Sequence, residues 1–397
     1  LFKILNKGKK MKATKLSLIA ILAIGIPSIS SASSLQEALT SGKISGEFAV
    51  TYEQRDMDKE LAKWGNYYND TDYSVGSFAL KYESGVWNNL SLTSKVRAYK
   101  TIFEGGEDEF HYQGKGDAAE RFWYKDGSRR SVDLEELFLA YNYEAISVKA
   151  GRQFISTDWM NKTQDALRID ANFDNTSIEA IWSQRHGRIY SRDYRPMTKM
   201  NENKGVYKIA LTQKFNENIS ATAYDFIAPD NRDIIGGKVN LKYGDTSFRA
   251  HYAVNKPDDS NEEDSSIIDL MLSTSIAGFT PYVGYIQIDK DQGFTHLAGE
   301  IINPFEEGDQ IYLKDAKTYY LGLSKSIGDL SATLLYGNTE YDKADESYEQ
   351  DETTLWLGYK LTSELNANLG LTHVNVDSDD LDETDQDQVN LTLTYSF

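Results

Sequence analysis

The chain has 397 residues, with 42 Lys and Arg against 61 Asp and Glu, and its formal net charge at pH 7 is −19. This excess of acid excludes a protein that binds nucleic acid through phosphate contacts, since those contacts require a basic surface. The sequence contains no cysteine, which excludes thiol catalysis and disulfide bonds. Downstream of residue 32 no run approaches the length of about 18 consecutive apolar residues, so we expect no transmembrane helix.

Residues 1–32 have the pattern of upstream residues followed by a cleaved signal peptide. Lys12 and Lys15 precede an eleven-residue apolar core, Leu16–Ile26, and small residues then offer a cleavage site. The core is too short to cross a bilayer as a helix, which needs about 20 residues; the alternative is a buried hydrophobic helix. We expect residues 33–42 to form a short periplasmic segment after cleavage.

From residue 43 onward, apolar and polar residues alternate with a period of two, as in a β-strand that has one apolar and one polar face. In the first such segment Ile44, Phe48 and Val50 share one face, while Glu47 and Thr51 share the other. The alternation recurs along the chain and predicts eighteen strands, near 43–56, 74–84, 90–103, 131–144, 146–156, 165–173, 176–188, 206–215, 219–227, 234–243, 246–256, 266–276, 279–289, 317–326, 330–341, 352–362, 365–376 and 387–397.

The connections between these strands are of two kinds. Every second one is a tight turn, such as Glu144-Ala145, whereas the alternate ones are mostly longer and polar, the longest being 104–130 and 290–316. Short turns at one end, long loops at the other and an even number of strands are typical of bacterial outer-membrane barrels. We therefore predict an all-β fold, a transmembrane antiparallel β-barrel over residues 43–397, with short periplasmic turns and long acidic extracellular loops.

A large soluble all-β protein, such as a propeller, is the alternative to the membrane barrel. Tyr and Phe recur at predicted strand ends, where the aromatic girdles of a membrane barrel would lie, and no fixed repeat with a blade signature appears. The last predicted strand alternates without a charge from Val389 to Phe397. These observations favour the outer membrane as the location and its lipid as a partner.

Two short segments resemble a known family. The sequence Ala-Gly-Arg-Gln-Phe-Ile-Ser-Thr-Asp-Trp-Met at 150–160 resembles the segment after strand 5 in OprD-like porins of the Opr family. Residues 34–47 are similar to the mature start of that family's epsilonproteobacterial branch. At Asp158 the family more typically has proline. The resemblance implies an 18-stranded channel for small hydrophilic solutes, narrowed by its third outer loop, which corresponds to 157–164.

Strand alternation also assigns side chains to the interior of the predicted barrel. Arg152 falls on the outward side unless Gly151 forms a bulge, which glycine in a strand often marks. Strand ends add Lys214, Lys242 and Lys360. The predicted pore-lining and constriction residues are Lys95, Arg97, Glu136, Lys149, Arg152, Asp158, Arg168, Asp170, Lys208, Lys238 and Arg249.

Two interpretations of these interior charges stay open. A ladder of positive charge that faces Asp158, Asp170 and Glu136 across a constriction would orient dipolar solutes and determine ion preference. Alternatively, the long cationic side chains merely solvate a wide lumen. Acidic runs at 258–264 and 377–387 resemble cation sites in composition, but solvated loop acid is the better interpretation, and we expect neither a metal nor a cofactor.

The remaining patterns do not favour an enzyme. The five histidines are scattered, and neither the His-Glu-x-x-His nor the Gly-x-Ser-x-Gly motif occurs. We predict an outer-membrane porin, a water-filled channel for passive diffusion of ions and small hydrophilic solutes. A surface-exposed structural or adhesive barrel and an outer-membrane hydrolase are the alternatives, and assembly as a homotrimer stays open.

Overall fold

The computed structural model describes residues 32–58, 70–105, 124–125, 128–129, 131–192, 194–377, 379–380 and 383–397. The predicted signal peptide, apart from residue 32, and most of the predicted loop 104–130 lie outside these residues. One helix precedes the strands, α1 (Leu35–Thr40), and two 3-10 turns occur later, η5 (Asn201–Asn203) and η6 (Gln310–Tyr312). No helix within the described ranges is long and apolar enough to cross a membrane.

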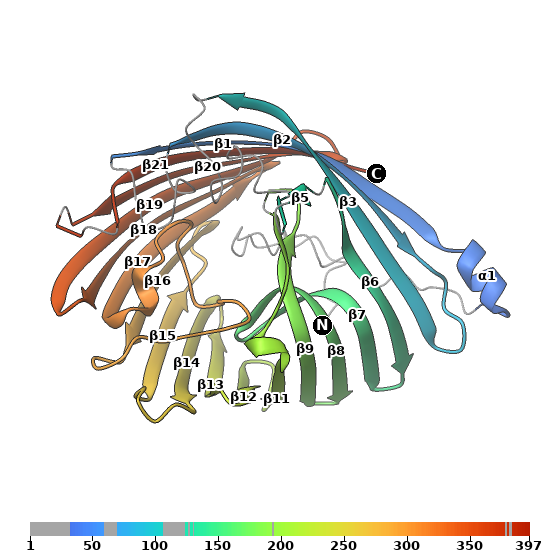
Figure 1. Ribbon diagram of the computed structural model, residues 1–397, viewed down its shortest axis with the longest axis horizontal. Helices are drawn as coiled ribbons and strands as arrows, with labels where there is room; N and C mark the ends of the chain where they lie inside the picture. The colour runs from blue at the N-terminus through green and yellow to red at the C-terminus, as the bar shows by residue number, and fades with distance from the viewer. Residues whose placement is uncertain are drawn as a thin grey trace.

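The strands run in chain order around one large sheet (Figure 1). Their bounds are β1 (Lys43–Met57), β2 (Thr71–Glu83), β3 (Leu90–Gly105), β4 (Tyr124–Lys125), β5 (Ser128–Arg129), β6 (Val132–Tyr143), β7 (Ile146–Thr157), β8 (Met160–Phe173), β9 (Thr176–Ile189), β10 (Tyr194–Lys199), β11 (Val206–Lys214), β12 (Ile219–Ala228), β13 (Arg232–Tyr243), β14 (Thr246–Pro257), β15 (Ser265–Ser273), β16 (Phe279–Ile288), β17 (Lys314–Ile327), β18 (Leu330–Lys343), β19 (Glu346–Lys360), β20 (Leu365–Val376) and β21 (Gln386–Ser396).

The sheet closes on itself. Consecutive wall strands pair antiparallel, and β1 pairs both with β2 and with β21, from Glu47↔Ser396 to Met57↔Gln386. Strand β10 pairs with the far end of β9, beyond the residues of β9 that pair with β11, and β4 and β5 form a separate two-stranded sheet. Eighteen strands therefore form the wall, which confirms the predicted closed antiparallel barrel.

The alternation that predicted the strands separates the two faces of this wall. On β17 and β18 the outward side chains Tyr319, Leu321 and Leu334 are exposed, whereas Thr318 and Thr339 are buried on the inside. An apolar outer band around a polar interior is the arrangement expected for a barrel in lipid.

Tight turns at one end of the barrel need left-handed backbone. Glu144 and Asp174 have φ values of 48° and 43°. The helix α1 lies at this end, where the Tyr82 hydroxyl donates to the Leu39 carbonyl at 2.6 Å. Its N-cap is Ser34, whose hydroxyl accepts the backbone N–H of Glu37. Both termini of the barrel are thus at the end with the short turns.

Several strands extend further than predicted. The predicted loop at 157–164 is wrong, because β8 begins at Met160 and only Asp158-Trp159 separates it from β7. A two-residue turn also joins β18 to β19, where Ala344 and Asp345 have φ values of 52° and 67°. These strand ends extend beyond the apolar outer band of the barrel, so their residues need not alternate between apolar and polar. The sequence pattern therefore does not predict them as strands.

Candidate functional site: a constriction inside the barrel

The hairpin of β7 and β8 leaves the wall before it turns. Strand β6 pairs with β7 only as far as Leu137↔Arg152, while β7 and β8 stay paired up to Thr157↔Met160. The turn residues Asp158 and Trp159 are 3% and 0% exposed. A connection that would lie in solvent at the rim of a simple barrel is therefore enclosed by other parts of the chain.

The turn contacts strands that are not its neighbours. The Lys238 ammonium on β13 donates to the Asp158 carboxylate at 2.7 Å, and Lys208 on β11 lies 3.8 Å from the same carboxylate. The Lys208 ammonium also donates to the Thr157 hydroxyl. Burial raises the pKa of the Asp158 carboxyl, but the nearby Lys238 and Lys208 outweigh it and lower this pKa overall. Asp158 is therefore a carboxylate at neutral pH.

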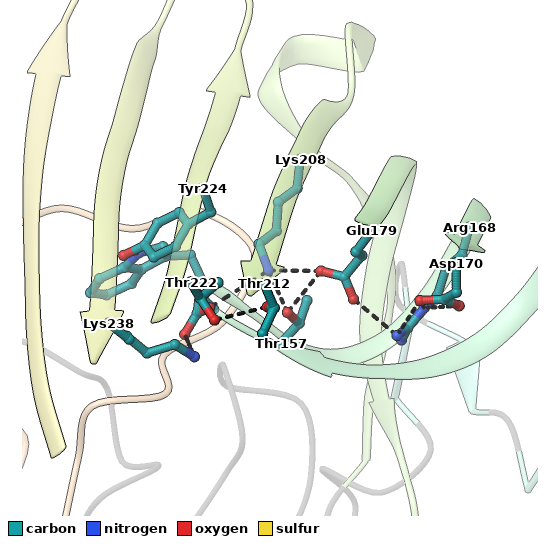
Figure 2. Close-up of polar contacts among 11 residues, drawn as sticks. Thr157, Arg168, Asp170, Glu179, Lys208, Thr212, Thr222, Tyr224 and Lys238 are labelled. Atoms are coloured by element: carbon teal, nitrogen blue, oxygen red, sulfur yellow. Dashed lines mark hydrogen bonds and ion pairs between the residues drawn. The ribbon is translucent and has the colours of Figure 1, made fainter. Parts of the chain in front are cut away.

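Charges of alternating sign continue along the inner wall from this turn (Figure 2). Glu179 accepts from Lys208 at 2.8 Å and lies 2.9 Å from the Arg168 guanidinium. Arg168 in turn donates to Asp170, two residues along β8, at 2.8 Å. We call these six side chains the charged row: Lys238, Asp158, Lys208, Glu179, Arg168 and Asp170.

A long connection also folds into the barrel and meets the turn. Residues 289–313, between β16 and β17, form this inward segment, whose Phe294, Ala298 and Ile302 are buried. Ala298 pairs with Met160 in a parallel bridge. Gly299 has a φ of +130°, and a Cβ there would lie 2.6 Å from the Asn161 backbone nitrogen, so only glycine permits this approach. The inward segment and the turn therefore form one packed unit.

The inward segment is fastened to the far wall. The Glu352 carboxylate on β19 accepts the backbone N–H groups of Glu306, Glu307 and Gly308 at 2.7, 2.9 and 2.7 Å. Arg55 on β1 donates to the Glu307 carboxylate at 3.1 Å. Three consecutive N–H groups aimed at one carboxylate fix both the position and the orientation of the segment.

A third element crosses the interior. The hairpin of β9 and β10 rises through the middle of the view in Figure 1, drawn in light green. At its tip Arg192 forms an ion pair with Glu306 of the inward segment and donates to Asn390 on β21 at 3.3 Å. The Tyr194 hydroxyl donates to the Asp133 carboxylate of β6 at 2.7 Å. The hairpin therefore links the inward segment to strands on the opposite side of the barrel.

The predicted residues on β3 form a second group of paired charges. Lys95 and Arg97 donate to the Glu135 carboxylate at 2.7 and 2.8 Å, and Arg97 is 1% exposed. Glu135 was not among the predicted residues. Strand pairing shifts by one residue between Lys95 and Val96, so Glu135 is an extra residue in β6 and escapes the period-two assignment. The predicted Glu136 lies 3.7 Å from Lys81 instead.

Arg152 contacts acidic side chains, although Gly151 beside it does not form a bulge. The pairing of β7 with β6 and β8 continues without a shift through Gly151, so the bulge that the sequence left open does not form, although Gly151 has a φ of +128°. Arg152 donates to Asp165 at 2.7 Å and to the Leu134 carbonyl at 2.9 Å. Its side chain is half-buried because β7 has separated from β6 beyond this point.

The remaining predicted residues lie apart from the charged row. Arg249 donates to Asp269 at 2.8 Å, and the Lys149 ammonium lies 5.6 Å from the centre of the Phe138 ring. Side chains near strand ends are exposed rather than packed in the interior: Lys214, Lys242 and Lys360. The structure thus brings together five of the predicted residues, Asp158, Arg168, Asp170, Lys208 and Lys238.

The wall opposite the charges is lined by hydroxyl groups. Thr318 pairs with Thr339 at 2.9 Å, Ser324 with Thr333 at 2.9 Å, and Thr354 donates to Thr372 at 3.1 Å. The interior of the barrel therefore has a side with the charged row and, across it, hydroxyl groups that hydrogen-bond to one another on β17, β18, β19 and β20. Within the described residues no group of His, Asp and Glu could hold a metal ion.

Comparison with known proteins decides the class of this barrel. The family model described as Gram-negative porin matches residues 17–396. The chain belongs to the Gram-negative porin family. This porin is therefore a channel of the Gram-negative outer membrane and not an enzyme, as its sequence predicted. No curated protein matches it in sequence.

Solved structures with the same fold include several outer-membrane channels. This porin superposes on Acinetobacter baumannii OccAB4 with a TM-score of 0.73 at 14% identity, over 91% of this chain and 99% of that chain. It superposes on Pseudomonas aeruginosa OccK1 (OpdK) with a TM-score of 0.70 at 16% identity, over 90% and 99%. The Pseudomonas aeruginosa OpdK structure with vanillate gives 0.70 at 15% identity, over 90% and 99%. At such low identity the likeness shows a shared fold.

Proposed function

We propose that this porin lets small hydrophilic solutes and ions diffuse passively through a constriction bounded by the β7–β8 turn, the inward segment and the β9–β10 hairpin. The observation that supports this most strongly is the charged row, which lies across the closed barrel from the paired hydroxyl groups of β17 and β18. The proposed lining residues are the eleven predicted from the sequence, together with Glu135.

The pairing of charges bears on selectivity. Most of the proposed cations have a carboxylate within ion-pair distance, as Arg97 has Glu135 and Arg249 has Asp269. A wall of alternating sign produces a local field across the lumen rather than a large net potential. We therefore expect weak preference between cations and anions, together with orientation of dipolar solutes.

The solute class is the finer part of the proposal. One protein of the same fold has been solved with vanillate, a small carboxylate, and we propose small carboxylates as test solutes here. Membership of the OprD-like group and of its epsilonproteobacterial branch stays a prediction from residues 34–47 and 150–160. Assembly as a homotrimer is likewise a prediction, which native mass spectrometry of the detergent-solubilised protein would test.

Conductance of the refolded porin in a planar bilayer tests the proposal. We expect discrete, long-lived steps and a reversal potential close to zero under a salt gradient. Replacing both Arg97 and Arg168 with Gln removes two positive charges from the wall and keeps all its carboxylates, so the reversal potential should shift toward cation preference. Replacing Lys43 with Gln is the control, because its side chain is exposed at the start of β1, outside the elements that bound the constriction, and salt screens its charge.

Two outcomes would contradict the proposal. A folded barrel that shows no conductance would favour the structural or adhesive alternative, in which the buried apolar cluster around Trp159 and Phe294 plugs the lumen. An unchanged reversal potential in the double Arg variant would show that the charged wall lies outside the solute path.

A further inference from the structure

A chain of buried aromatic side chains holds the β7–β8 turn, in addition to the charged row. The Trp159 indole N–H donates to the Tyr224 hydroxyl at 2.8 Å, and this hydroxyl lies 2.6 Å from His251 Nε2. Trp159, Tyr224 and His251 are 0%, 4% and 3% exposed. These two hydrogen bonds connect the turn to β12 and β14, two wall strands that are distant from β7 and β8 in the sequence.

The donors and acceptors in this chain determine the protonation state of His251. An indole N–H can only donate, so the Tyr224 oxygen accepts from Trp159 and its own single proton must find an acceptor. In the described part of the chain, the other atom bonded to this hydroxyl is His251 Nε2. A proton on Nε2 would leave the buried Tyr224 hydroxyl proton without an acceptor, which is costly. The arrangement therefore requires a neutral His251 with its proton on Nδ1.

Charged groups surround His251 from each packed element. Lys238 on β13 and Asp269 on β15 are its partners by strand register, and His296 of the inward segment stacks with Trp159 at 6.3 Å between ring centres. Burial lowers the pKa of His296, so this ring is neutral as well. The charged side chains near His251 are Lys208, Lys238, Arg249, Asp158 and Asp269.

We propose that Tyr224 and His251 are positioning residues of the channel: neutral His251 keeps the β7–β8 turn docked in the lumen, and its protonation releases the turn and widens the pore. Protonation of His251 would leave the Tyr224 hydroxyl proton without an acceptor. It would also place a fourth cation beside Lys208, Lys238 and Arg249. Release moves Asp158 and Trp159 away from the solute path together. The inference rests on the proposed diffusion function and adds that the width of the path depends on pH.

Single-channel recordings at about pH 8 and about pH 4 test this, the lower value being well below the ordinary histidine range because the buried site favours the neutral ring. We expect the wild type to visit a larger conductance level more often at the lower pH. Tyr224→Phe removes the linking hydroxyl, so the ratio of time in the larger to the basal level should rise about tenfold at both pH values. His251→Gln keeps an acceptor oxygen, but glutamine does not titrate. This variant should therefore stay at the basal conductance level at both pH values.

His373→Gln is the matched control. It makes the same replacement at an exposed histidine, whose side chain is 58% accessible and paired with Asp387, and it should keep the wild-type pH response. A wild type with the same dwell ratio at both pH values would overturn the inference, as would a His251→Gln variant that responds like the wild type. Absence of any conductance in the wild type would instead contradict the proposed function, so the two failures are distinguishable.

A disulfide between the turn and the inward segment provides a second test. The natural chain has no cysteine, and Met160 and Ala298 are paired in a bridge, so Met160→Cys with Ala298→Cys should form a single disulfide. The oxidised variant should lose the larger conductance level at low pH, and a reductant should restore it, which also shows that the variant folds. A pH response that persists in the oxidised form would overturn the inference.

Discussion

Lys208 shows at the scale of one residue how the interior charges act. Its side chain is fully buried and its ammonium lies 2.8 Å from Glu179 and 3.8 Å from Asp158. An enclosed cation with two carboxylates stabilises the turn rather than attracting a passing anion. A ladder of positive charge was one of two interpretations of the sequence, whereas at this residue the structure has a cation neutralised by its neighbours.

Replacing Lys208 with Met should destabilise the barrel, because Glu179 and Asp158 would each lose a buried partner. Breaking a buried ion pair from one side costs about 3 kcal/mol. Urea unfolding in lipid vesicles measures this loss. Lys290→Met, at a side chain that is 75% exposed, should unfold at the wild-type midpoint, and equal midpoints for the two variants would contradict the stabilising role of Lys208.

At the scale of an element, the β7–β8 hairpin depends on Gly151. A Cβ at this position would lie 2.2 Å from the Leu137 carbonyl oxygen, and the φ of +128° is unfavourable for other residues. The strand therefore passes close to β6 at the point where it begins to leave the wall. No apolar pattern in the sequence marks this departure, since the hairpin exchanges wall neighbours for contacts with β11 to β14.

Gly151→Ala should lower the yield of folded barrel because both the backbone conformation and the close approach to Leu137 are affected. We expect a loss of about 3 kcal/mol, as for a strained backbone position combined with a clash. Gly278→Ala is the control: its φ is +79°, but nothing lies within 4 Å of an added Cβ, so it should cost about 1 kcal/mol. Heat-modifiable mobility on gels reports the folded fraction, and similar yields would refute the argument.

The inward segment is the second element that determines the interior, and Glu352 is its attachment. Glu352→Gln exchanges one acceptor oxygen for an amide NH₂, which faces backbone N–H groups that also donate. We expect the segment to detach and the single-channel conductance to increase. Glu349→Gln, at an exposed residue of the same strand, should leave the conductance unchanged. A wild-type conductance in Glu352→Gln would place the segment outside the solute path.

At the scale of the whole molecule, closure between β1 and β21 allows every other contact. Gly46 and Phe397 exchange two backbone hydrogen bonds, of 2.9 and 3.0 Å, and the Phe397 ring lies 6.0 Å from that of Phe48. Gly46 is required there, because a Cβ would lie 2.5 Å from the Phe397 ring. The seam thus combines backbone pairing with aromatic packing on the outside of the barrel.

Two variants separate these contributions to closure. Phe397→Ala keeps the backbone bonds and should lose only the aromatic contact, worth about 1 kcal/mol, whereas deletion of Phe397 should lower the folded fraction further. Phe215→Ala is the control, since Phe215 is 63% exposed near a tight turn. Normal folding of the deletion variant, measured by its resistance to proteolysis in outer-membrane fractions, would contradict a role of this residue in closure.

Much of the wall was predictable from the sequence, because strand alternation is a local property that each segment carries by itself. Side chains that meet lipid must be apolar and those that meet water must be polar, so the number of strands and the face of Thr318 or Leu321 follow from a period of two. The same rule placed Lys208 and Lys238 inside. It missed Glu135, because one extra residue in β6 reverses the alternation.

Only the tertiary structure decided what fills the barrel. The contacts of Asp158 with Lys238, of Glu352 with the inward segment, and of Trp159 with Tyr224 join residues from 44 to 80 positions apart. Such contacts require the closed wall, which brings the interior faces together. Polar segments that turn inward have no apolar period, so no sequence pattern predicts them. The sequence thus determined the wall, because the side chains of each face must suit the lipid or the water that they meet. The closed barrel determined the constriction, because its contacts join residues across the interior.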